Sequence, residues 1–266
     1  MSWVCYLCAK QNDEAERDAC ACCKRPRDYA PKSYIDRAKA QPLALHGIAS
    51  GQFAFRPEQL EALVRGGLDL DAQDTLGWTA LHCAAQVGEA RVVAAILERD
   101  SSKALLEAAT RPGGWRALHY AVAAGHLAVV EELLAADADV DARADEPEGP
   151  TPLHLAAQRG HGHVVDLLLD CGANPNFTAS ALRRTALHFA VASRSLKCAR
   201  VLLARTNLAS VSDAEGMSPL QQAHLLRREP ASPDSSSEQL VLLLEVHENP
   251  HDRLPLLSAF LRDAIG

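Results

Sequence analysis

Hydrophobic residues recur through the middle of the chain with the spacing of an amphipathic helix. In three segments a pair of valines is followed, three to four residues later, by a second aliphatic pair, which places all four residues on one face of a helix. Such a face has to be covered by another element, so each segment predicts a helix that packs against neighbours. The segments are Val92-Val93 with Ile96-Leu97, Val129-Val130 with Leu133-Leu134, and Val164-Val165 with Leu168-Leu169.

A second pattern precedes these segments and repeats at a nearly constant interval. Its centre is a Leu-His pair, and its histidines are His82, His119, His154 and His188, which are 37, 35 and 34 residues apart. Most copies begin with Thr, a favoured helix cap, and Pro where present suits the first helical turn. Glycine then follows where a helix must end in a left-handed residue. The pattern predicts a first helix in each copy, ending at Gly88, Gly125 and Gly160; a weaker copy is residues 218–223.

These copies resemble the ankyrin repeat family, whose period is about 33 residues. The resemblance implies an all-α fold, a solenoid of helix-turn-helix repeats whose turn-rich junctions form projecting hairpin loops. A junction at residues 67–71 indicates a degenerate opening repeat. The last repeat contains a polar insertion, residues 229–237, which we expect to be flexible. We expect about six repeats over residues 41–248 (41–76, 77–113, 114–148, 149–182, 183–215 and 216–248) and a C-terminal capping helix over 249–266.

The repeated histidines are interpreted as structural groups. One histidine per repeat at a fixed position is what a hydrogen bond between the helix start and the hairpin would produce. A metal or catalytic role would need other ligands beside each ring, and no cysteine or carboxylate recurs there. No Ser/His/Asp arrangement or phosphate-binding loop is found either, so the sequence does not indicate an enzyme.

Composition restricts the classes of partner. The chain has 266 residues, 48% hydrophobic and 23% charged, with a formal net charge of -7. This charge argues against general binding to nucleic acid or membranes, which calls for concentrated positive charge. No stretch has the roughly 18 consecutive apolar residues of a membrane span, and the N-terminus is unlike a signal peptide. We therefore expect an intracellular monomer, in the cytoplasm, the nucleus or both.

The eight cysteines fall into two groups. Cys83, Cys171 and Cys198 are scattered through helical sequence and are expected to be small buried hydrophobic residues. The other group contains two Cys-x-x-Cys pairs near the N-terminus, and each pair can present two thiolates to one tetrahedral ion. The predicted ligands of a single structural Zn²⁺ are Cys5, Cys8, Cys20 and Cys23, with Cys22 left as a spare thiol.

Around these ligands, residues 1–28 resemble the Ran-binding-protein (NZF) zinc-finger family. The matching residues are Trp3, Asn12 and the four cysteines, although the spacing from Asn12 to Cys20 is one residue longer than is common in the family. The resemblance implies a small zinc-ribbon-like finger, followed here by a linker over residues 29–40. It also implies binding to ubiquitin or to single-stranded RNA, where the contacting residues are present.

Neither set of contacting residues is complete. Ala9-Lys10 stands where ubiquitin-binding members have Thr-Phe. The loop from residue 13 to residue 19 has four carboxylates and no aromatic residue for base stacking, which disfavours RNA more strongly. The favoured hypothesis is a non-enzymatic adaptor or scaffold that binds protein partners on the concave face of the repeats. The alternative is a ubiquitin or, less favoured, RNA reader in which the finger recognises and the repeats dock.

Candidate contact residues lie near the predicted hairpin tips. Trp78 and Trp115 each follow a glycine that opens a repeat, and large rings there are either interface anchors or packing against the adjacent hairpin. Arg111 and the pair Arg183-Arg184 are candidates for holding an acidic segment of a partner.

Overall fold

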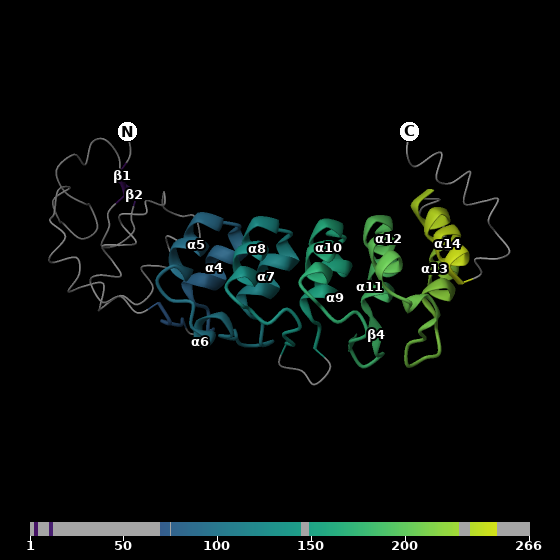
Figure 1. Ribbon diagram of the computed structural model, residues 1–266, viewed down its shortest axis with the longest axis horizontal. Helices are drawn as coiled ribbons and strands as arrows, with labels where there is room; N and C mark the ends of the chain where they lie inside the picture. The colour runs from purple at the N-terminus through teal and green to yellow at the C-terminus, as the bar shows by residue number, and fades with distance from the viewer. Residues whose placement is uncertain are drawn as a thin grey trace. The chain divides into compact units, whose positions relative to one another are not determined.

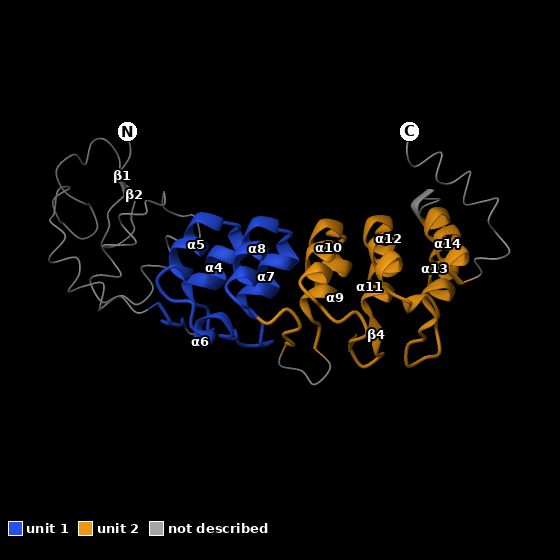
Figure 2. Ribbon diagram, viewed as in Figure 1, with its two compact units in different colours: residues 1–138 blue, residues 139–266 orange. Residues whose placement is uncertain are grey.

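The computed structural model describes residues 3–4, 11–12, 70–74, 76–144, 149–228 and 235–248. The chain divides into two compact units, residues 1–138 and residues 139–266 (Figure 2). Helices make up most of the described residues, in agreement with the expected all-α repeat class (Figure 1). The linker, residues 41–69 of the predicted opening repeat, the four predicted zinc ligands and the predicted capping helix lie outside the described residues.

In the described part of unit 1, two helix pairs pack against each other. The first helices α4 and α7 contact one another, as do the second helices α5 and α8 (Figure 1). Between them lie side chains that are almost completely buried, including Leu81, Ile96, Leu118 and Leu133. The elements are β1 (Trp3–Val4), β2 (Gln11–Asn12), α4 (Ala80–Val87), α5 (Ala90–Leu97), α6 (Lys103–Leu106), α7 (Ala117–Ala124) and α8 (Leu127–Ala135).

Among the residues of unit 2 that the structure describes, three helix pairs are arranged in the same way. Its first helices α9, α11 and α13 pack in that order, and so do its second helices α10, α12 and α14. Leu153, Leu168, Leu187 and Leu202 are buried between them. The elements are α9 (Pro152–Arg159), α10 (Gly162–Asp170), β3 (Thr178–Ala179), β4 (Arg184–Thr185), α11 (Ala186–Ala192), α12 (Leu196–Arg205), a 3-10 helix (Leu208–Ser210), α13 (Pro219–Arg228) and α14 (Ser235–Glu248).

The predicted helix ends are confirmed. Gly88, Gly125 and Gly160 follow α4, α7 and α9 with φ of 90°, 78° and 78°, in the left-handed region where glycine has no Cβ penalty. The next repeat differs, because Arg194 follows α11 with φ of 54° at the position that corresponds to these glycines. An L-residue other than Gly, Asn or Asp is uncommon in this conformation.

Three features differ from the sequence expectations or were absent from them. The short helix α6 lies between the first two described helix pairs, with Ser102 as its cap and Leu105 and Leu106 buried. The hairpin before α11 contains a short antiparallel pair of strands, β3 and β4. The prediction of a polar insertion over residues 229–237 is wrong at its C-terminal end, because α14 begins at Ser235 and Ser237 is buried.

Candidate protein-binding surface

The histidine prediction is confirmed by the hydrogen bonds of His82. The backbone N–H of Thr79 donates to Nδ1 of His82 at 3.1 Å, and the Thr79 hydroxyl lies 2.8 Å from the same nitrogen. On the other side of the ring, Nε2 lies 3.0 Å from the carbonyl oxygen of Ala108 in the following hairpin. A carbonyl oxygen only accepts, so Nε2 carries the proton and Nδ1 is the acceptor. The ring therefore joins the helix start to the next hairpin.

The arrangement recurs in unit 2 at His154 and His188. Nε2 lies 3.0 Å from the Phe177 carbonyl oxygen in the first case and 3.1 Å from that of Met217 in the second. Burial lowers the pKa of His154 from the ordinary 6.5 to about 4, and burial also lowers the pKa of His188. Both rings are neutral near pH 7 and serve as structural groups. No cluster of His, Cys, Asp or Glu side chains suited to a metal ion occurs within the described ranges.

The two candidate tryptophans pack against one tyrosine. The ring centroid of Tyr120, on α7, lies 4.5 Å from that of Trp78 and 5.1 Å from that of Trp115. The Tyr120 hydroxyl lies 2.9 Å from the hydroxyl of buried Thr110. Trp78, Trp115 and Tyr120 remain partly exposed. Sequence reasoning missed Tyr120; the available signal was an aromatic residue directly after the repeat histidine, between two tryptophan-bearing junctions.

An exposed leucine and an exposed arginine flank these rings. Leu76 is 52% exposed, and its carbonyl oxygen accepts a hydrogen bond of 2.7 Å from the backbone N–H of Arg111. Within its own tip, the Leu76 N–H donates to Oδ1 of Asp74 at 2.8 Å. The Arg111 side chain is exposed. We call the group Leu76, Trp78, Arg111, Trp115 and Tyr120 the aromatic surface.

The candidate arginines of unit 2 have different environments. The Arg184 guanidinium pairs with Asp213 at 3.3 Å, and the Asp213 carboxylate is almost completely buried. Burial raises the pKa of Asp213, but hydrogen bonds from the backbone of Met217 and Glu215 and from Arg184 outweigh it and lower the pKa overall. Arg184 therefore joins two successive hairpins. Arg183 is exposed at the preceding tip.

An open depression of about 540 Å³ lies at the last described hairpin of unit 2 and the adjacent face of α13. Leu225 is 49% exposed there. A hairpin tip and a first helix therefore border an accessible hollow. Its lining residues are Glu215, Gly216, Met217, Gln221, His224, Leu225 and Arg227.

The expectation that all three scattered cysteines are buried is wrong for one of them. Cys198 is completely buried and Cys83 is largely so, and burial raises the pKa of Cys83 to about 11. Cys171 is exposed, because it follows the last residue of α10 at the helix end, where the chain turns toward the hairpin.

Among the described helices, none combines the length and apolar character needed to cross a membrane. The family model for ankyrin repeats (three copies) matches residues 45–144, 136–213 and 153–229. A search of curated proteins returned no match. Ankyrin repeats support a role in protein–protein interaction, and proteins built from them are typically non-enzymatic interaction modules. The matched segments span more than half of the chain and coincide with the observed helix pairs, so the chain belongs to the ankyrin repeat family.

Proposed function

We propose that this chain is a non-enzymatic adaptor whose aromatic surface binds a protein partner. The observation that carries the proposal is the pair of partly exposed tryptophans held against Tyr120, beside an exposed leucine and an exposed arginine. Large aromatic residues and arginine are the residue types that dominate binding energy at protein interfaces.

The packing of the rings supports this role because it restricts their motion before a partner arrives. Each tryptophan is held on one side by Tyr120, and Tyr120 is held in turn by its hydroxyl contact with Thr110. Side chains that are already ordered lose less conformational entropy on binding, so more of the buried area contributes to affinity. Leu76 adds apolar area at the tip, and Arg111 adds a charge that can select a partner with a carboxylate at that point.

The test is affinity capture from cell lysate with the full chain and two double variants. Leu76→Asp with Arg111→Glu alters the aromatic surface at exposed positions and leaves the packed rings in place. The matched control is Leu127→Asp with Arg91→Glu, which alters an exposed leucine and an exposed arginine on α8 and α5. We expect the first variant to lose the captured partner and the control to retain it. Retention of the partner by both variants would disprove the proposal.

The N-terminal cysteines carry a second part of the proposal, a structural zinc site. Cys5, Cys8, Cys20 and Cys23 have the donor type and pairing that tetrahedral zinc prefers. The antiparallel pairing of β1 with β2 also supports a finger, because Cys5 and Cys8 occur in the sequence between these strands. Zinc content measured by mass spectrometry should be one ion per chain and should fall to none in Cys5→Ser with Cys8→Ser.

The same variants separate the adaptor from the ubiquitin reader. If the full chain captures ubiquitin conjugates, and the cysteine variant loses them while Leu76→Asp with Arg111→Glu retains them, recognition belongs to the finger. If the captured partner depends on the aromatic surface and survives loss of the cysteines, recognition belongs to the repeats.

A further inference from the structure

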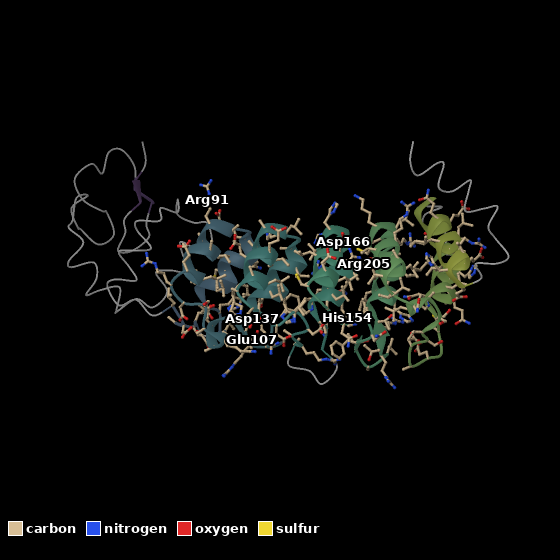
Figure 3. The ribbon with its side chains drawn as sticks, in the orientation of Figure 1. Arg91, Glu107, Asp137, His154, Asp166 and Arg205 are labelled. Atoms are coloured by element: carbon tan, nitrogen blue, oxygen red, sulfur yellow. The ribbon has the colours of Figure 1, made fainter. Side chains whose placement is uncertain are left out.

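The distribution of charge in unit 2 is strongly uneven. Between Cys171 and Ser212 the sequence contains six Arg and Lys residues and no Asp or Glu, within a chain whose net charge is -7. Arg184 pairs with Asp213, and Arg205 pairs with Asp166 and Asp170 on α10 (Figure 3).

Several cations of unit 2 lie at or next to the turns between first and second helices. The turn after α9 and the turn after α11 are in contact, because the Ser193 hydroxyl donates to the Ala157 carbonyl oxygen at 2.9 Å. A Cβ on Gly162 would lie only 2.9 Å from that of Lys197, which shows how closely the turns approach. We call the cations at these turns and at the end of α13 the basic edge: Arg159, Arg194, Lys197, Arg200 and Arg227.

The repeat pattern does not call for a cation at each of these positions. In unit 1 the first helices α4 and α7 end without any basic residue in the last turn, although they have the same role in their repeats. Lys197 and Arg200 lie near the N-terminal end of α12, where the helix dipole disfavours positive charge, and the first turn holds no acidic residue. Arg194 adopts a left-handed conformation at a position where three other repeats have glycine. Residues kept in an unfavourable setting are often kept for function.

We infer that the basic edge is a second binding surface, which takes an acidic peptide segment of a protein partner. Arg159, Lys197 and Arg227 are exposed, and the turns at residues 158–163 and 193–200 contain no carboxylate. A carboxylate-rich segment matches this charge.

The extent of the edge favours a short peptide over other polyanions. Asp166 and Asp170 follow the first turn within α10, so the stretch without carboxylates is short and suits a short peptide better than a long polyanion. Residues 158–163 and 193–200 contain no Phe, Tyr or Trp, the large rings on which the bases of single-stranded nucleic acid stack. The surface differs in residues and charge from the aromatic surface, so the two proposals stand or fall separately.

The test measures binding of a fluorescein-labelled oligoglutamate peptide to the full chain by fluorescence anisotropy. Arg159→Glu with Lys197→Glu reverses two exposed cations of the basic edge. Arg91→Glu with Lys103→Glu makes the same change in net charge in unit 1 and is the matched control. We expect the first variant to bind about tenfold or more weakly and the control to bind like the wild type. Affinity should also fall as salt is added.

Several results would overturn the inference. These are an equal loss in both double variants, no loss in either, or tighter binding of oligouridine or of phosphatidylserine vesicles through the same residues. Circular dichroism establishes that each variant is folded. If the charge reversal unfolds the chain, the neutralising variant Arg159→Gln with Lys197→Gln replaces it, and it must weaken oligoglutamate binding for the inference to stand.

Discussion

Lowering the pH should destabilise the repeats through His154. This ring is 1% exposed, and burial lowers its pKa from 6.5 to about 4. Above pH 6.5 the ring is neutral in both the folded and the unfolded chain. As the pH falls toward 4, the unfolded chain takes up a proton that the folded chain does not, so the contribution to stability is lost over this interval.

The size of the effect follows from proton linkage. With pKa values of 6.5 unfolded and about 4 folded, this histidine removes about 2 kcal/mol of unfolding free energy between pH 7 and pH 5. Burial is the main cause, and because Nδ1 already accepts the Thr151 N–H, a proton there would also break that bond. His188 acts in the same direction, because burial also lowers its pKa.

The assay is urea unfolding followed by circular dichroism at pH 7, 6 and 5. His154→Asn removes the titrating ring and loses the bond to the Phe177 carbonyl oxygen, so it should be less stable at pH 7 by about 1–3 kcal/mol. Its stability should then fall by about 2 kcal/mol less than that of the wild type between pH 7 and pH 5. His163→Asn, at an exposed position on α10, is the control. Equal pH dependence in the wild type and His154→Asn, or a His154 NMR titration near 6.5, would refute the reasoning.

Three further predictions concern single residues of unit 2. Arg194→Gly should raise the unfolding free energy, measured by urea unfolding, by up to about 1 kcal/mol, because glycine suits φ of 54°. The same substitution should weaken oligoglutamate binding. Unchanged binding would count against the basic edge. Asp213→Asn should lower stability by about 1–3 kcal/mol at pH 7, because the buried carboxylate accepts bonds from Glu215, Met217 and Arg184. The deficit should shrink progressively as the pH falls below the ordinary value of 3.8 toward the lowered pKa of Asp213. Among the three scattered cysteines, maleimide should label exposed Cys171 first, as measured by peptide mapping. Cys83 and Cys198 should react last, because burial raises the pKa of both of these thiols. Faster labelling of Cys198 than of Cys171 would contradict the burial of Cys198 between the helices.

The helix pairs could be predicted because every signal for them is local. The cap residue, the Leu-His pair and the closing glycine lie within ten residues of one another in three of the four copies, as Thr79 and Gly88 illustrate. The same applies to the aliphatic stripe of the second helix. Because such short signals recur, the repeats are recognisable from the sequence, and apart from α6 the helices from α4 to α12 lie at the expected positions.

The contacts that were missed depend on residues far apart in the sequence. Asp213 lies 29 residues from Arg184, and a charged pair of this kind has no sequence pattern within one repeat. Trp78 and Tyr120 belong to successive repeats, so only their packing shows that both tryptophans share one partner ring. Helix α6 escaped prediction because its four residues are too few to show a helical period.

Equivalent positions in the repeats separate what the fold needs from what recognition needs. The histidine of each first helix is constant in four copies, and in three of them, His82, His154 and His188, its bond to the next hairpin explains why. The position two residues before the start of each first helix is not constant. It is occupied by Trp78, Trp115, Pro150, Arg184 and Met217, so the fold accepts very different side chains there. Variation at such positions is available for binding. The tryptophans of unit 1 lie at this position, Arg159 and Lys197 of unit 2 lie at other positions where the repeats differ, and their different chemistry favours two different partners.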